Sequence, residues 1–186
     1  GLPQFIQEGA VVSQHPANGF QCSTCHNDLK EFTRYETTNV KFPSGAVIDS
    51  GDADTNLCIN CHQGRESTVS VNKLIGETED DAQSESLRFL NPHYFAAGAT
   101  RYGTEAKGAY EYADKTYVGF FQHGGDDGPN NCTDCHSAHT QEVDWESCTE
   151  CHEEVTAKEE LQNIRYNLTD FDGNGDDSEG IYFEIQ

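Results

Sequence analysis

The chain has 186 residues, of which 34% are hydrophobic and 17 are glycine, a thin apolar inventory for a core of this size. Its 33 acidic and 11 basic residues give a formal charge of -22, which repels nucleic-acid phosphates and anionic membrane surfaces. No segment approaches the roughly 20 apolar residues of a membrane span. We therefore expect one domain, or at most two small ones, with no nucleic-acid partner and no membrane span.

The N-terminal part of the chain lacks regular patterning. Residues 1–20 are predicted to form an extended arm, because Pro16 biases His15 away from helical geometry. Residues 27–57 contain turn-forming stretches such as Pro43-Ser44-Gly45 and are predicted to be loop.

Two helices are predicted farther along the chain. Residues 63–131 form a long insertion, in which residues 80–90 are predicted to be helical because two aspartates suit a first turn. The strongest helical pattern covers residues 146–166, which contain a spaced apolar set and neither Gly nor Pro. The predicted fold class is mostly irregular and loop-rich, with short α-helices, little β-structure and cofactors in place of much of the core.

All eight cysteines belong to four copies of one motif, C-x-x-C-H, and these copies lie within a predicted main domain of residues 21–166. The copies are Cys22-Ser23-Thr24-Cys25-His26, Cys58-Ile59-Asn60-Cys61-His62, Cys132-Thr133-Asp134-Cys135-His136 and Cys148-Thr149-Glu150-Cys151-His152. This motif is the signature of covalent haem attachment. Two thiols one helical turn apart reach the two vinyl groups, and the adjacent histidine reaches the iron.

The alternatives are zinc sites and disulfides, which paired cysteines also form. Neither alternative requires a histidine directly after the second cysteine of every pair. We therefore predict four covalently bound haem c groups. Covalent haem attachment of this kind takes place outside the cytoplasmic membrane, which implies an exported protein.

The histidine count predicts the second ligand of each iron. Four of the eight histidines belong to the motifs, and the others are His15, His93, His123 and His139. Methionine is absent, which excludes Met ligation. Four irons need four distal ligands, so we predict bis-His ligation of every iron.

This count favours electron transfer over catalysis. Enzymes that act on substrates with haem keep one iron position open, whereas eight histidines fill eight axial positions. A compact chain of this length is about 40 Å across, so four macrocycles inside it lie close together. We expect a non-enzymatic electron carrier.

Two residues beside the motifs have more than one interpretation. Arg65 is either a solvated surface residue or a guanidinium partner for haem propionates. His139 follows His136 by three residues and cannot reach the opposite face of the same iron, so it is predicted to ligate a neighbouring haem.

Residues 167–186 form an acidic C-terminal segment that resembles the start of an EF-hand calcium loop. Position 12 of the pattern is Ile181, so another residue must supply the missing carboxylate. The alternative is an acidic, turn-rich linker. The candidate calcium ligands are Asp170, Asp172, Asn174, Asp176 and Glu179.

Several stretches together resemble a known family. They are Phe42-Pro43-Ser44-Gly45, Leu57 to Arg65 (which includes Cys61-His62-Gln63-Gly64-Arg65), Asn91 to Ala99 and Cys135 to Val143. The set is similar to the extracellular tetrahaem cytochromes that polymerise into filaments, the OmcE-type nanowires, and more distantly to the hexahaem OmcS.

The resemblance implies a continuous haem chain in a loop-rich fold and subunits that join head to tail. It also implies that one haem takes its distal ligand from the neighbouring subunit, for which His15 is the natural candidate. Redox partners or extracellular electron acceptors complete the expected partners. The alternative is a monomeric periplasmic shuttle in which His15 ligates a haem of its own chain.

Overall fold

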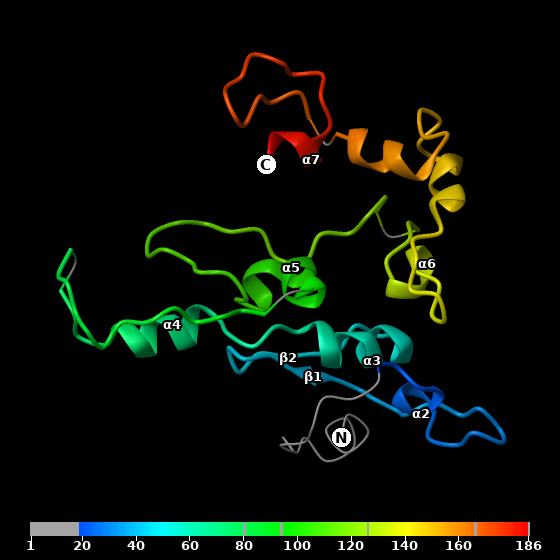
Figure 1. Cartoon of the computed structure of the whole chain (residues 1–186), viewed down its shortest axis with the longest axis horizontal. Coiled ribbons are helices and arrows are strands. Elements are labelled where there is room, and N and C mark those ends of the chain that lie inside the picture. The colour runs from blue at the N-terminus through cyan, green and yellow to red at the C-terminus, as the bar shows by residue number, and fades with distance from the viewer. Residues whose placement is uncertain (1–18, 80, 94, 126, 166, 186) are drawn as a thin grey trace. The chain divides into compact units, whose positions relative to one another are not determined.

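A computed structural model of the chain describes residues 19–79, 81–93, 95–125, 127–165 and 167–185 (Figure 1). His15 and nearly all of the predicted N-terminal arm lie outside the described residues. The chain divides into two compact units, one ending at Cys132 and the other starting at Thr133.

The elements of both units are short and are joined by long loops, which confirms the predicted loop-rich fold class (Figure 1). In the first unit they are α2 (Cys22–Cys25), β1 (Val40–Lys41), β2 (Val47–Ile48), α3 (Ala53–His62), α4 (Thr68–Ile75), α5 (Ala97–Tyr102) and the 3-10 helix η1 (Gly103–Glu105). Helix α6 (Cys132–Cys135) starts at the last residue of that unit, and η2 (Trp145–Glu150), η3 (Lys158–Asn163) and α7 (Ile181–Glu184) follow. Strands β1 and β2 pair antiparallel in a two-stranded sheet.

A small apolar core lies where α3, α5 and β1 pack together. Its buried residues are Val40, Phe42, Ile59, Ala99, Tyr102 and Ala106. Helix α3 packs on this core. It starts after Asp52, because the Asp52 carboxylate accepts a hydrogen bond from the Thr55 N–H at 2.7 Å and caps the first turn. The core thus positions the helix whose C-terminal half carries the second C-x-x-C-H motif.

The loop before α3 is held by Asn56, which is 2% exposed. Its Oδ1 accepts from the N–H and the hydroxyl of Ser50 at 3.0 and 2.9 Å. Its Nδ2 donates to the Thr38 carbonyl at 3.2 Å and to the Asp49 carboxylate at 2.9 Å. One amide therefore ties the turn after β2 to the haem-motif helix.

The helix predicted over residues 80–90 is wrong for the described residues 81–90, which form turns. The Ser84 hydroxyl lies 2.7 Å from that of Ser86 and also accepts from the Ser86 N–H at 3.3 Å. Short polar side chains that bond the local backbone compete with helical hydrogen bonds. Asp81, expected in the first helical turn, instead has a φ of 63°.

The continuous helix predicted over residues 146–166 is also wrong, since the structure has two separate 3-10 helices, η2 and η3. The Glu160 carboxylate accepts from the Thr156 N–H at 2.5 Å, from the Thr156 hydroxyl at 2.8 Å and from the Ala157 N–H at 3.0 Å. These bonds build a new helix start at residue 157. The chain between the two helices carries Cys151 and His152 of the fourth motif.

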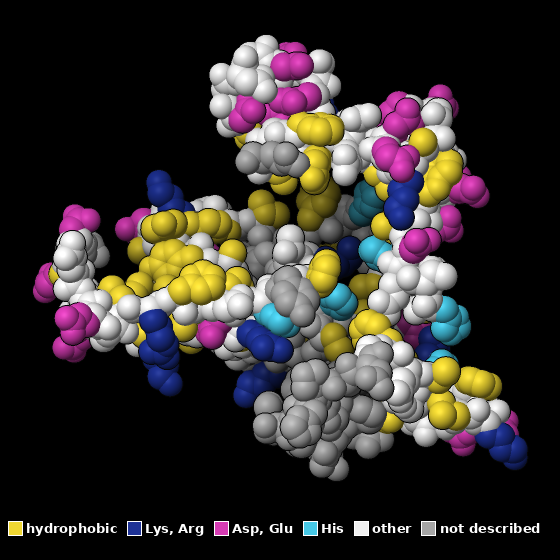
Figure 2. All heavy atoms as spheres, in the orientation of Figure 1, with side chains coloured by type: hydrophobic (Ala, Val, Ile, Leu, Met, Phe, Trp, Pro, Cys, Tyr) yellow, Lys and Arg dark blue, Asp and Glu magenta, His cyan; other side chains and the backbone are white. Residues whose placement is uncertain are grey.

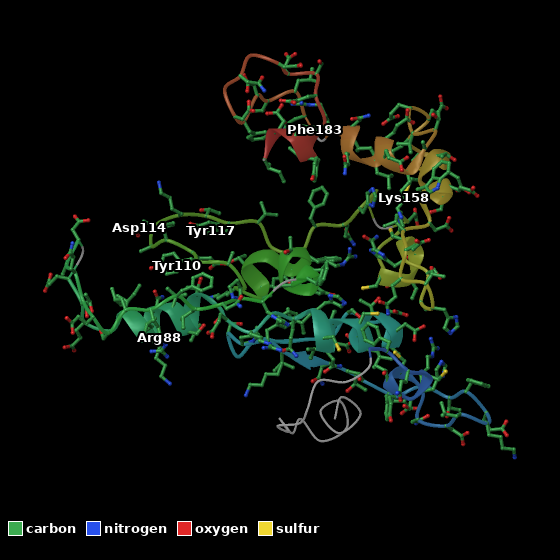
Figure 3. All side chains as sticks on the ribbon, in the orientation of Figure 1. Arg88, Tyr110, Asp114, Tyr117, Lys158 and Phe183 are labelled. Atoms are coloured by element: carbon green, nitrogen blue, oxygen red, sulfur yellow. The ribbon has the colours of Figure 1, made fainter. Side chains whose placement is uncertain are left out.

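A long loop between η1 and α6 leads to His123. It runs out through Tyr110, turns near Asp114 and returns through Tyr117 (Figure 3). The Thr104 N–H donates to the Val118 carbonyl at 3.0 Å and closes the base of the loop beside α5.

The surface carries the charge expected from the sequence. Acidic side chains gather on the C-terminal segment and at the tip of the segment that follows α4 (Figure 2). No helix of the described ranges has the length and apolar character required to cross a bilayer.

Candidate haem-attachment sites

Each C-x-x-C-H motif lies in or directly beside a short helical turn. The first motif occupies α2, the second the last two turns of α3, the third α6, and the fourth begins in η2. Helical residues three apart project from the same side, so the two thiols of each pair face one way. The eight cysteines are all free of disulfides.

The motif histidines are oriented by backbone carbonyls. His26 Nδ1 lies 2.8 Å from the Phe32 carbonyl oxygen, and His62 Nδ1 lies 2.6 Å from the Phe95 carbonyl oxygen. A carbonyl only accepts, so each ring must donate through Nδ1–H. The neutral ring then has its lone pair on Nε2, which is the arrangement that metal-ligating histidines use.

Both acceptor residues adopt the same unusual backbone conformation. Phe32 has a φ of 53° and Phe95 a φ of 56°. Left-handed conformations cost non-glycine residues roughly 1–3 kcal/mol and cluster at functional sites. The strain is therefore found where a carbonyl is turned toward a motif histidine.

His152 has a different partner, since its Nδ1 lies 3.3 Å from the Glu154 carboxylate. A carboxylate at Nδ1 favours the same tautomer, with the proton on Nδ1 and the lone pair on Nε2. Three of the four motif histidines thus have a hydrogen-bond acceptor at Nδ1.

The first and third motifs are followed by the same loop structure, which sequence inspection missed. His26 forms a β-bridge with Arg34, and His136 forms one with Val143. The carbonyl of the second cysteine then accepts from Tyr35 N–H at 3.0 Å in the first loop and from Asp144 N–H at 2.8 Å in the third. Each loop also turns at a left-handed residue, Phe32 or Gln141, which the sequences themselves do not share.

The segment that carries the second motif packs against the segment that leads into α5. The Arg65 N–H donates to the Pro92 carbonyl at 3.0 Å. A Cβ at Gly98 would lie 2.9 Å from the His62 carbonyl oxygen, so glycine is required for α5 to approach α3 this closely. The stretches Leu57 to Arg65 and Asn91 to Ala99, which are far apart in sequence, therefore form one site.

Cysteines of three motifs are close to one another in the first unit. The pKa of the Cys58 thiol is raised first by a hydrogen bond with the Cys132 thiol and second by burial. Burial, followed by the charge of Cys25, raises the pKa of Cys61. The Cys132 N–H also donates to Thr55 Oγ1 at 3.1 Å, which ties the last residue of the first unit to helix α3.

The predicted distal histidines lie on loops. His93 is half-buried, with a φ of 72° and its N–H 2.9 Å from the Asn91 side-chain oxygen. His123 is exposed, and its N–H donates to the Asn130 side-chain oxygen at 2.9 Å. His139 is exposed in the loop after the third motif. His15 lies outside the described residues.

Two hollows lie beside histidines. One of about 560 Å³ is lined by Ala97, Thr100, Arg101, Val118, Gly119, Phe121 and His123. A second, of about 270 Å³, lies against His136 and the loop that follows it. Cavities of roughly 300–1,000 Å³ are typical of bound small molecules and cofactors, so the larger one has the size for part of a haem.

Curated relatives match part of this chain. It is 35% identical over 96 residues to the C-type polyheme cytochrome OmcB of Geobacter sulfurreducens (strain DL-1 / KN400), and 35% identical over 94 residues to the C-type polyheme cytochrome OmcC of Geobacter sulfurreducens (strain ATCC 51573 / DSM 12127 / PCA).

The chain is similar to polyhaem c-type cytochromes.

The two matches cover 45% and 44% of this chain and 11% of each relative, so the chain spans about a tenth of the length of these relatives. No family model matches, and no solved structure matches. The similarity supports the interpretation of the C-x-x-C-H units as haem-attachment motifs.

The zinc alternative finds no support in the geometry. Among the described residues, the one group of three or more His, Cys, Asp or Glu whose ligand atoms converge is Asp170, Asp172 and Glu184. No cysteine or motif histidine belongs to it.

The C-terminal segment is a loop closed by Glu184, a residue that the sequence analysis missed. Glu184 is 3% exposed, and its ligand atom lies within 4.8 Å of those of Asp170 and Asp172. Glu179, the predicted source of the missing carboxylate, instead accepts from Asn174 Nδ2 at 2.8 Å. Glu184 lies three residues beyond position 12 of the EF-hand pattern, which is why the motif did not reveal it.

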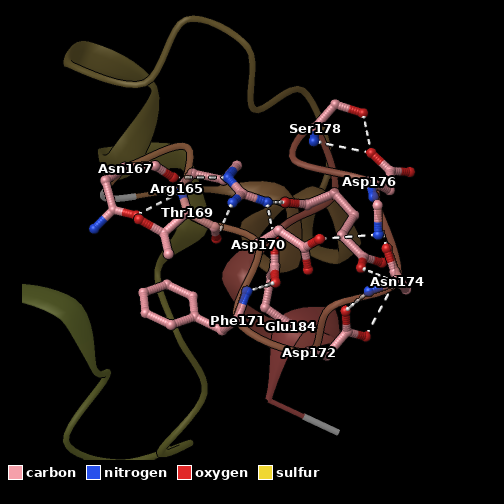
Figure 4. A network of polar contacts seen from close by, with 12 residues as sticks. Arg165, Asn167, Thr169, Asp170, Phe171, Asp172, Asn174, Asp176, Ser178 and Glu184 are labelled. Carbon is pink, nitrogen blue, oxygen red and sulfur yellow. Dashed lines mark hydrogen bonds and ion pairs between the residues drawn. The ribbon is translucent and has the colours of Figure 1, made fainter.

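Arg165 organises this loop (Figure 4). Its guanidinium donates to the Glu184 carboxylate at 2.6 Å, to the Asn167 carbonyl at 2.8 Å and to the Thr169 carbonyl at 2.9 Å. A hydrogen bond from the Phe171 N–H, followed by the Arg165 guanidinium, lowers the pKa of Glu184 against the opposing effect of burial.

The other predicted calcium ligands also accept hydrogen bonds within the loop. The Asp170 carboxylate accepts from the N–H groups of Gly173 and Gly175 at 2.6 and 2.9 Å. Asn174 Oδ1 accepts from the Asp176 N–H at 2.7 Å. Calcium binding by this loop stays a prediction.

Proposed function

We propose that this chain is a tetrahaem c-type cytochrome that passes electrons along closely spaced haems, each iron held by two histidines. The observation that supports this most directly is the orientation of His26 and His62, whose Nδ1 atoms are occupied by carbonyls. Haem c supplies one-electron chemistry when bound. The chain supplies paired thiols for attachment and imidazole rings fixed in the tautomer that binds iron.

Rigid ligand geometry suits electron relay, because small rearrangement between redox states speeds electron exchange. The left-handed residues Phe32 and Phe95 restrict rotation of the rings that they contact. The hydrogen bond between Cys132 and Thr55 ties the second and third attachment points together. Both devices keep the cofactors at constant spacing.

Four haems and eight axial histidines leave no coordination position for a substrate, so we propose a carrier and not an enzyme. Mass spectrometry of the denatured holoprotein should show four haem additions. Electron paramagnetic resonance of the oxidised protein should show low-spin signals alone. Tight carbon monoxide binding to the reduced protein without ligand loss would contradict the full coordination.

We further propose that the exported subunits polymerise head to tail into an extracellular filament. Support comes from the resemblance to tetrahaem filament cytochromes and from His15, which lies on the predicted arm before the first motif. A contact between unlike faces generates an open filament when the rotation between neighbouring subunits does not close into a ring. A cross-subunit bond from His15 to iron would fix the haem spacing at the joint.

The alternative is a monomeric periplasmic shuttle, and the two are separated by assembly state. Negative-stain microscopy of the wild type should show filaments, and His15→Ala should abolish them while leaving four covalent haems. His93→Ala is the matched control, because it removes a distal ligand from a position within the first unit. Filaments that persist in His15→Ala with every haem still low-spin would exclude the shared ligand. A wild type that stays monomeric at every concentration would favour the shuttle.

Calcium binding at the C-terminal loop is a separate proposal, supported by the convergence of Asp170, Asp172 and Glu184. Calorimetry with calcium should give binding that Asp170→Asn removes, because Asp170 is at position 1 of the loop. Equal heats for the two proteins would support the alternative of an acidic linker.

A further inference from the structure

Arg101 is a partly buried cation without a carboxylate partner among the described residues. Its Nη2 donates to the Asn130 carbonyl, and its guanidinium carbon lies 4.8 Å from the centre of the Phe120 ring. Its Nε is buried and makes no hydrogen bond. A buried N–H without an acceptor costs about 1–3 kcal/mol, so an unmade bond at this position points to a missing ligand.

Among the described residues no carboxylate forms an ion pair with Arg101, although acidic residues outnumber basic ones by 33 to 11 in the sequence. The four ion pairs of the described residues do not include Arg101. Glu105 also faces Phe120, whose N–H donates to its carboxylate at 3.0 Å, but Glu105 is exposed and forms no ion pair with Arg101. Buried charges in proteins are normally paired, so this site suits an anion that the described part of the chain does not supply.

The location of Arg101 identifies that anion by its chemistry. Arg101 and His123 line the same cavity of about 560 Å³. The Asn130 carbonyl that Arg101 contacts lies two residues before Cys132, the first attachment point of the third motif. Arg101 therefore lines the same cavity as a predicted iron ligand and contacts the segment just before a haem-attachment motif.

We propose that Arg101 binds a propionate of the haem that His123 ligates, and that it sets the potential of that haem. This inference rests on the proposed multihaem function. A guanidinium matches a carboxylate in shape and forms charge-assisted hydrogen bonds with it. Its positive charge disfavours the oxidised haem, which carries one more positive charge than the reduced haem, and so raises the reduction potential.

Phe120 holds the guanidinium in place for this role. The Phe120 ring stacks on Tyr102 with a centroid distance of 5.2 Å and packs against the apolar core. Arg101 lies over the same ring. Arg65, the candidate propionate partner from the sequence, is exposed and offers no comparable enclosure.

The test is spectroelectrochemical titration of the holoprotein and of Arg101→Gln, with Arg65→Gln as the matched control. In Arg101→Gln one of the four potentials should fall while the other three hold. In Arg65→Gln all four should stay at their wild-type values. Unchanged potentials in Arg101→Gln with four haems attached overturn the role of Arg101, as does a shift confined to Arg65→Gln.

Haem counting by mass spectrometry separates this inference from the function on which it rests. A wild type without covalent haem overturns the proposed function itself. Where Arg101→Gln attaches fewer than four haems, Arg101→Lys decides the question, because it keeps the charge and loses the Nε–H. Because the charge is retained, Arg101→Lys should attach four haems and keep all four potentials close to their wild-type values. Loss of haem from Arg101→Lys as from Arg101→Gln, or a clear fall of one potential in Arg101→Lys, overturns the role of the Arg101 charge.

Discussion

The change Asn56→Asp tests how the second haem motif is held in place. It keeps the size of the side chain and the Oδ1 that accepts from Ser50. It replaces the Nδ2 donors with an oxygen that faces the Thr38 carbonyl and the Asp49 carboxylate. Cys58 follows two residues later, so the strain is transmitted to the attachment helix α3.

The expected cost at pH 7 is about 2–4 kcal/mol. Two lost hydrogen bonds contribute about 0.5–1.5 kcal/mol each, and desolvation of the new carboxylate adds to them. A typical domain has about 5–15 kcal/mol of stability in total, so the change is large. With a denaturant slope of about 2 kcal/mol per molar urea, the midpoint should fall by about 1–2 M.

The effect should depend on pH in a defined direction. In the native protein the Asn56 side chain, followed by the Gly51 N–H, holds the pKa of Asp49 below its usual value. That contribution is present above the unfolded pKa of about 3.9 and is lost only as the pH falls through the lower folded value. In Asn56→Asp two adjacent carboxyls raise the pKa of the pair, so the deficit shrinks as the pH falls from 7 toward about 4.

The assay is urea unfolding followed by circular dichroism and by haem absorbance at pH 7 and at about pH 4.5. Asn39→Asp is the matched control, because Asn39 is exposed and has one weak side-chain contact, to Thr38 Oγ1 at 3.4 Å. Both variants add one carboxyl, so general charge effects cancel in the comparison. A deficit that is equal at the two pH values, or equal to that of the control, refutes the reasoning.

Three further predictions follow from the packing and charge. Gly98→Ala should cost about 1–3 kcal/mol in urea unfolding, because its Cβ would lie 2.9 Å from the His62 carbonyl; an unchanged midpoint contradicts this. The pKa of Glu184 is lowered by the Phe171 N–H and then by Arg165, so its contribution is present above the unfolded pKa of about 4.3 and is lost as the pH falls. In the wild type the rate of proteolysis of the C-terminal unit should therefore rise as the pH falls, and in Glu184→Gln this rise should be smaller. The same pH profile in both proteins would contradict the prediction. Added salt should narrow the spread of the four haem potentials by screening repulsion between successive electrons, whereas a spread insensitive to salt argues otherwise.

The motif positions and the ligand inventory could be predicted from the sequence alone. Attachment of haem needs two thiols one helical turn apart and a histidine beside the second, and this pattern is local. The absence of methionine and the count of eight histidines are also properties of the sequence. The loop-rich fold class follows from abundant glycine and a thin apolar inventory, and the short elements of the structure confirm it.

The sequence pattern predicted helices wrongly where polar side chains form hydrogen bonds with the nearby backbone. The helix expected over 80–90 is absent from the described residues 81–90, where Ser84 bonds to Ser86. The helix expected over 146–166 is divided because Glu160 accepts hydrogen bonds from Thr156 and Ala157 and starts a new helix at Ala157. Helical periodicity records the apolar face of a segment but not the side chains that compete for its N–H groups.

The contacts that orient the ligands were decided by the tertiary structure alone. The Phe95 carbonyl reaches His62 across 33 residues, and Thr55 reaches Cys132 across 77. Which residues form such pairs depends on the path of the chain in three dimensions. No sequence motif indicates which backbone carbonyl or which buried threonine hydroxyl will be the acceptor. The unmade hydrogen bond of Arg101 is likewise visible only once the neighbours of its guanidinium are known, because a side chain is unsatisfied only relative to its surroundings.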